Sequence, residues 1–158
     1  MKILQERGKD GGDDSLILQT AIRLVVPFIQ LFGMYVIVHG HYSPGGGFQG
    51  GVILGGAFIL LALGYDLPTS KRYFPVRINA ILSNSGALIF TGIAALCAAL
   101  GGYFLDYSIL ARLLPIDPVE WRSLGIFLVE VGVGLGVMSI MVSIYWDMAS
   151  AGRMEEGL

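Results

Sequence analysis

The segment His39-Gly40-His41-Tyr42-Ser43-Pro44-Gly45-Gly46-Gly47-Phe48-Gln49-Gly50-Gly51 separates two long apolar stretches in a chain of 158 residues. It contains both histidines of the chain and six of its 23 glycines, and it has no Lys, Arg, Asp or Glu. Irregular backbone at membrane depth has to be buried in protein or line water, because lipid offers no hydrogen-bond partners. The segment therefore predicts a break between two membrane spans, of the kind at which transport proteins handle ions.

The composition around this segment is that of a membrane protein. Hydrophobic residues make up 54% of the chain and charged residues 14%, with a mean hydropathy of +0.71. Soluble domains average about 45–50% apolar residues and about 25% charged residues. A net charge of −2 without a basic cluster predicts no nucleic-acid partner. The single Cys97 supports neither a disulfide framework nor a thiolate metal site.

Four segments are long enough to cross a bilayer. A hydrocarbon core of about 30 Å takes about twenty residues of helix. The apolar segments of that length lie at about residues 16–38, 48–65, 78–101 and 124–146. We therefore predict an all-α integral membrane protein with four transmembrane helices in a domain of residues 16–149. Residues 1–15 form a polar tail, expected to be poorly ordered, and residues 150–158 form a second tail.

The distribution of cations predicts the orientation. Lys and Arg accumulate on the cytoplasmic side of membrane proteins. With an even number of spans, the two tails and the loop between the second and third spans share one side, which holds Lys2, Arg7, Lys9, Lys71, Arg72, Arg77 and Arg153. The other side holds only Arg112 and Arg122. Both termini are thus predicted to be cytoplasmic, in a multi-pass protein of the cell (plasma or inner) membrane.

Polar residues inside the spans are candidates for function. Arg23 and Gln30 share one helical face with Pro27, and Arg23 either snorkels to the interface or contacts the mouth of an ion path. Asn84 is expected to form an interhelical hydrogen bond. Glu130 is a carboxylate inside the fourth span, where a functional role is the default hypothesis. Helical rise places Arg23 roughly 10 Å away from it in depth and makes Gln30 its better partner.

Small residues recur along two of the spans. Gly47, Gly51 and Gly55 follow one another every four residues in the second span. The fourth span has a similar stripe that includes Gly132 and Gly136. Such stripes let helices approach closely in lipid. We therefore expect both stripes to pack against neighbouring helices.

Several familiar sites do not fit the central segment. No Gly-Lys-Ser/Thr follows its glycines and no strand precedes them, so it is not a phosphate loop. His39 and His41 lack a third ligand for zinc. No catalytic triad can be assembled on one side of the membrane. We expect no metal, no cofactor and no enzymatic activity in this chain by itself, although it could belong to a redox enzyme complex.

Residues 40–51 resemble the signature of the B subunit of multisubunit Na⁺/H⁺ antiporters of the Mrp (Mnh) type. That signature reads Gly-His-x-x-Pro-Gly-Gly-Gly-Phe-x-Gly-Gly, and the chain matches all nine fixed positions: Gly40, His41, Pro44, Gly45, Gly46, Gly47, Phe48, Gly50 and Gly51. Residues 22–28, Ile-Arg-Leu-Val-Val-Pro-Phe, are similar to the family's first span. The resemblance covers about residues 15–149. It makes the nine positions candidates for the ion path.

The resemblance implies a membrane subunit of a large hetero-oligomeric complex in a lipid bilayer, with Na⁺ and H⁺ as the exchanged ions. Related subunits also occur in redox-driven assemblies of the energy-converting hydrogenase type, so two kinds of partner complex stay open. A third possibility is a purely structural subunit whose glycines only dock helices. In the transport hypotheses, Glu130 is the candidate ionisable site, and a proton-exchanging role for His41 is open. Gly46 is expected to need glycine if its φ is positive.

Overall fold

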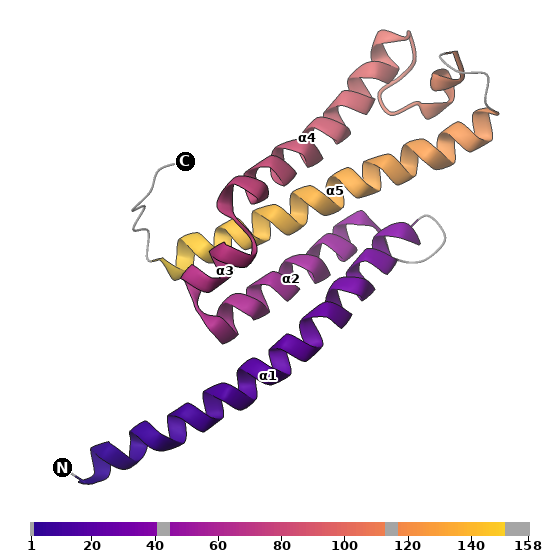
Figure 1. Cartoon of the computed structure of the whole chain (residues 1–158). Helices are drawn as coiled ribbons and strands as arrows, with labels where there is room; N and C mark the ends of the chain where they lie inside the picture. Colours follow the sequence, from indigo (N-terminus) through magenta and orange to yellow (C-terminus); the bar gives the residue numbers. More distant parts are fainter. Residues whose placement is uncertain (1, 41–44, 113–116, 151–158) are drawn as a thin grey trace.

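A computed structural model describes residues 2–40, 45–112 and 117–150 of the chain (Figure 1). Every regular element in these ranges is a helix: α1 (Lys2–Val38), α2 (Gly47–Tyr65), α3 (Leu67–Tyr73), α4 (Val76–Ala99), the 3₁₀-helix η1 (Tyr107–Arg112) and α5 (Pro118–Ala149). The helices long and apolar enough to cross a membrane comprise Leu16–Val38, Gly47–Tyr65, Val76–Ala99 and Val119–Ala149. The predicted all-α fold with four spans is confirmed. The orientation of the termini stays a prediction.

Two boundaries differ from the sequence analysis. Residues 2–15 continue α1 as a helix, so α1 begins well before the predicted span. Once the apolar part of α1 is helical, each further residue adds a hydrogen bond without a new nucleation cost. α5 begins six residues earlier than Leu124, because Asp117 caps it by accepting a hydrogen bond from the Val119 amide at 2.9 Å and Pro118 occupies its first turn.

The short helix α3 was not predicted. Asp66 both ends α2 and starts α3, with its carboxylate accepting a hydrogen bond from the Thr69 amide at 2.9 Å. This backbone hydrogen bond lowers the pKa of Asp66 below its ordinary value. Ser70 of α3 is buried and accepts a hydrogen bond from Trp146 Nε1 at 3.2 Å. These contacts fold α3 beneath the ends of α2 and α5.

α5 is the central helix of the bundle. It lies between α2 and α4, and α1 packs along the other side of α2 (Figure 1). A core runs from Ile37 near the end of α1 to Phe74 and Trp146 at the α3 end, and it also contains Leu54, Met138 and Val142. Phe74 stacks on Phe58 with a centroid distance of 4.4 Å. The first half of α1 extends beyond the other helices (Figure 1).

Glycines bring α2 into backbone contact with α5. A Cβ added to Gly47 would overlap the main-chain carbonyl of Glu130, and one added to Gly51 would lie 2.6 Å from Gly134 O. At Gly55 it would lie 3.3 Å from Met138 O. Each step of four residues on α2 thus matches a step of four on α5. The two helices run parallel, in a register set by the glycine stripe.

A different face of α5 packs against α4. Gly86 of α4 faces the backbone of Gly132 and Gly136, and an added Cβ would lie 2.5 Å from Gly132 O and 2.7 Å from Gly136 N. Farther along, Asn79 Nδ2 donates a hydrogen bond to Ser143 Oγ at 2.6 Å. Glu130 points to the α2 side of α5, away from this stripe. Gly86 was missed because it has no neighbouring glycine at helical spacing in α4.

Gly51→Ala is expected to destabilise the bundle, because its Cβ would push the backbones of α2 and α5 apart. Overpacking of this kind costs about 1–3 kcal/mol of unfolding free energy. Gly56→Ala is the matched control, since an added Cβ there meets nothing within 4 Å and alanine favours the helix by about 0.5–1 kcal/mol. The measurement is the unfolding temperature of each variant in detergent. Equal temperatures for the two variants would contradict the packing described.

Candidate functional site

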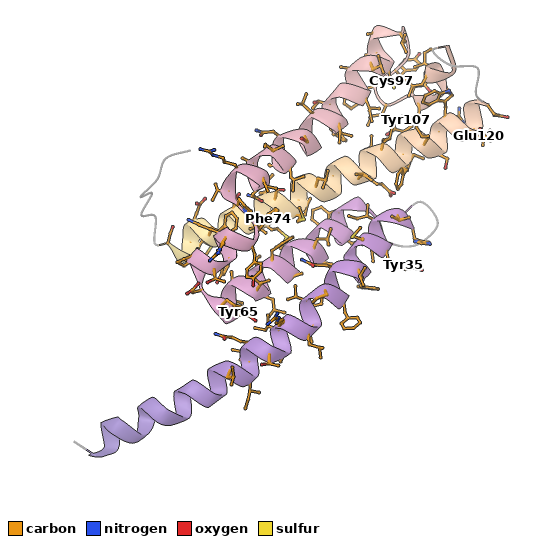
Figure 2. All side chains as sticks on the ribbon, viewed as in Figure 1. Tyr35, Tyr65, Phe74, Cys97, Tyr107 and Glu120 are labelled. Atoms are coloured by element: carbon orange, nitrogen blue, oxygen red, sulfur yellow. The ribbon has the colours of Figure 1, made fainter. Side chains whose placement is uncertain are left out.

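The site is the junction at which α1 ends and α2 begins. The His39 amide donates to Tyr35 O at 3.0 Å and the Gly40 amide donates to Ile37 O at 3.3 Å, which closes the last turn of α1. The His39 ring stacks on Tyr35 with centroids 4.1 Å apart, and its Nδ1 lies 3.1 Å from Tyr35 O. His39 is therefore held by its own helix. Figure 2 labels Tyr35 at this end of the bundle.

α2 starts at Gly47 with Gly46 as its N-cap. The Gly46 amide donates to Gln49 Oε1 at 2.9 Å, and Gly46 O accepts from the Gly50 amide at 2.9 Å. Gln49, which occupies a variable position of the signature, thus closes the first turn by reaching back to the cap. Gly46 has φ −155°, which is extended backbone. A positive φ is therefore not the reason for glycine at this position.

The reason for glycine at this junction is the carboxylate of Glu130. A Cβ added to Gly40 would lie 2.6 Å from Glu130 Oε2 and 2.7 Å from Oε1, and one added to Gly46 would lie 3.0 Å from Oε1. Oε2 is buried. The carboxylate therefore sits between the end of α1 and the start of α2, in space that two missing side chains leave open.

The local dipoles surround Glu130 with opposite partial charges. The first turn of α2 carries backbone amides without helical acceptors and contains no acidic residue. Negative charge beside such a turn is favourable. The last turn of α1 presents carbonyl oxygens with partial negative charge, which favour a cation. The junction can thus accommodate a carboxylate together with a proton or a cation.

Other candidate residues lie elsewhere. Gln30 lines a cavity of about 380 Å³ with Arg23, Pro27 and Tyr65. Ten residues of helix, about 15 Å, separate Gln30 from Gly40. The expected pairing of Gln30 with Glu130 therefore does not fit the structure.

Among the described residues, Asn84 has no hydrogen-bond partner on another helix, and its expected interhelical hydrogen bond stays a prediction. It is exposed on α4, and Thr91, on the same face, donates to Ala87 O of its own helix at 2.7 Å. Asn79, one helical turn and a residue earlier, makes the contact with α5 instead. This part of α4 has three polar residues, and the sequence does not indicate which of them contacts α5.

The remaining positions of the signature differ in what the structure describes. His41 and Pro44 lie outside the described residues, and their roles stay predictions. Gly45 is half-buried, Gly50 packs against Ile37 and Gly33 O of α1, and Phe48 is 63% exposed. Within residues 2–40, 45–112 and 117–150 no three His, Cys, Asp or Glu side chains are grouped to hold a metal ion.

The matching family model and the similar sequences point to the same kind of relative, a subunit of an antiporter. The family model described as a domain related to the MnhB subunit of Na⁺/H⁺ antiporter matches residues 17–143. The chain is 36% identical over 133 residues to the B subunit of the Na(+)/H(+) antiporter of Bacillus subtilis (strain 168), covering 79% of this chain and 91% of that one. It is 32% identical over 142 residues to the putative antiporter subunit mnhB2 of Staphylococcus aureus (strain Newman), covering 89% and 98%.

A solved structure is also similar. A chain in the structure of the membrane-bound sulfane sulfur reductase (MBS), an archaeal respiratory membrane complex, matches with a TM-score of 0.63 and 29% identity. The match covers 84% of this chain and 57% of that one. This chain therefore spans less than two thirds of its structural relative.

Gly40→Ala is expected to displace the Glu130 carboxylate and make it more reactive toward a hydrophobic carbodiimide, which attacks protonated carboxyls. Moving the carboxylate from the α2 N-terminus removes a stabilisation of charge worth about 0.3–1 kcal/mol, which predicts labelling about two- to fivefold faster. Peptide mass spectrometry measures the labelling rate of Glu130. Gly92→Ala is the control, because its added Cβ meets nothing within 4 Å, and its rate is expected to equal that of the unmodified chain. A slower or unchanged rate in Gly40→Ala would contradict the geometry.

Proposed function

The chain belongs to the MnhB family of domains related to a subunit of Na⁺/H⁺ antiporters, and on this basis we propose that it is a membrane subunit of a multisubunit monovalent cation/proton antiporter of the Mrp type. It is a multi-pass cell-membrane protein. The similarity to the B. subtilis protein extends over 91% of that protein, so both consist largely of the same membrane domain. Other subunits of such a complex are its partners.

The observation that carries a transport role is the position of Glu130 against Gly40, Gly46 and the first turn of α2. A carboxylate can hold either a proton or a hard cation, since both bind its oxygens. Occupation by one excludes the other, which is the requirement for exchange. We assign Glu130 the role of this exchange group in an ion-translocating membrane domain. Positive-inside counting places the junction toward the outer face.

The glycines of the signature then have two tasks. Gly47 and Gly50 bring α2 against α5 and α1, and Gly40 and Gly46 leave room for the carboxylate. Phe48 projects from the same turn and is 63% exposed. An exposed aromatic side chain beside the exchange group suits contact with another protein of the complex or with lipid. His41 and Pro44, between these elements in sequence, are proposed to shape access to the junction.

A second assembly is favoured by the structural likeness to a chain of a respiratory membrane complex. In that case the same subunit would belong to a redox-driven ion pump, without carrying the redox centre itself. The two alternatives differ in the partners. Purification of the native complex and identification of its subunits by mass spectrometry distinguishes them, since iron–sulfur or hydrogenase-like subunits are expected only in the redox-driven assembly.

Glu130→Gln tests the role of the carboxylate. Glutamine keeps the size of the side chain but can neither release a proton nor neutralise a cation, and losing a charged hydrogen-bonding group costs about 1.5–3 kcal/mol. We expect Na⁺-dependent proton exchange in everted membrane vesicles to fall at least about tenfold, with the subunits still co-purifying. Fluorescence of a pH-sensitive dye after addition of Na⁺ measures the exchange.

Glu120→Gln is the matched control. Glu120 is an exposed carboxylate in the first turn of the same helix, away from the glycines (Figure 2). Its exchange rate and pH profile are expected to equal those of the unmodified complex. Normal exchange by an assembled Glu130→Gln complex would favour the third possibility, a subunit that only packs helices.

A further inference from the structure

Arg23 is a cation inside a membrane span, and the described side chains include no ion-pair partner for it. It belongs to the span Leu16–Val38 and is exposed. Among the side chains that the structure describes, none forms an ion pair with it. A charge at this depth is costly unless it is paired or reaches the interface. The guanidinium therefore either reaches the interface or is compensated by a group outside the described side chains.

Two hollows meet at Arg23. One, of about 380 Å³, lies between α1, α2 and α3. Arg23, Gln30 and Tyr73 contribute polar groups to its wall, and most of the other lining residues are apolar. The other is an open strip along α1 between Leu16 and Leu24, lined among the described residues by that helix alone. A mostly apolar space with a few polar groups at one end suits an amphiphilic ligand.

The polar end of the first hollow lies toward α3. Tyr65, labelled in Figure 2, donates its hydroxyl to Gln19 O at 3.2 Å, which is about one helical turn from Arg23. Side chains of a helix lean toward its N-terminus. The guanidinium of Arg23 therefore leans toward the level of Tyr65 and the α3 end of the hollow.

The charges at that end are predominantly positive. Lys71 and Arg72 occupy the last turn of α3, are exposed, and directly precede Tyr73 in the wall of the hollow. Asp66 directly follows Tyr65, another residue of the wall, and its carboxylate accepts a hydrogen bond from the Thr69 amide, so one negative charge stands against the two cations of α3 and Arg23. Clustered cations beside a pocket between transmembrane helices are typical of sites for anionic lipid headgroups.

We propose that this hollow binds an anionic phospholipid, with its phosphate at Arg23 and the cations of α3 and an acyl chain against Val26, Phe58 and Leu61. The cations at the α3 end match the charge of an anionic headgroup, and the apolar side chains Val26, Phe58 and Leu61 match its acyl chain. This site is separate from Glu130 and does not rest on the proposed exchange.

Native mass spectrometry of the purified full-length complex tests the proposal. The complex is supplied with phosphatidylglycerol or with zwitterionic phosphatidylcholine, and retained lipid is counted. We expect retention of phosphatidylglycerol, weakened about tenfold by Arg23→Gln, since a charge-assisted hydrogen bond is lost. Arg23→Lys, which keeps the charge, should retain part of the binding.

Arg77→Gln is the matched control, because Arg77 is an exposed cation near α3 that lines neither hollow. Its lipid retention is expected to be unchanged. Equal losses in Arg23→Gln and Arg77→Gln, or no preference for phosphatidylglycerol, would overturn the site. Displacement of the lipid by inorganic phosphate alone would show a phosphate site and overturn the acyl-chain part. Unchanged lipid with loss of another protein of the complex in Arg23→Gln would assign Arg23 to a partner's carboxylate instead.

Discussion

The backbone contact between α2 and α5 determines where the other parts of the bundle lie. Because Gly47 and Gly51 have no side chains, their helix approaches Glu130 and Gly134 to a distance at which a single methyl group would collide. Such contacts replace the hydrophobic drive that is absent between helices in lipid. Another face of α5 packs against Gly86 of α4, and α1 packs antiparallel to α2. The position of the Glu130 carboxylate follows from the same register, since Glu130 lies opposite Gly47, the first glycine of the stripe.

Much of this arrangement could be predicted from the sequence. Apolar length identified the spans, and the four-residue glycine spacing identified the face of α2 that packs. The sequence did not show which helix each glycine stripe packs against, because a stripe of small residues is compatible with any neighbouring helix. Gln30 was assigned to Glu130 from depth alone, and depth ignores which face each residue occupies. α3 was not predicted, because a seven-residue segment that follows Asp66 and contains Pro68 is equally typical of a turn.

The junction also shows why a signature can be recognised before its chemistry is understood. The backbone of Gly46 is extended, and its missing side chain leaves room for a carboxylate 84 residues later in the chain. No local pattern connects the two positions. Gln49, by contrast, acts within its own turn, so local sequence could have indicated its capping role.

The lengths of α5 and α2 have a consequence for the surrounding bilayer. α5 has 32 residues and α2 has 19, which correspond to about 48 Å and about 28 Å, against a hydrocarbon core of about 30 Å. The longer helix must tilt or project, and the glycine contacts hold the shorter one along it. Any shared tilt leaves α2 too short to reach both surfaces. Such hydrophobic mismatch is relieved by local thinning of the membrane, and thinning above the glycine junction would bring bulk water within reach of a carboxylate that the sequence places inside a span.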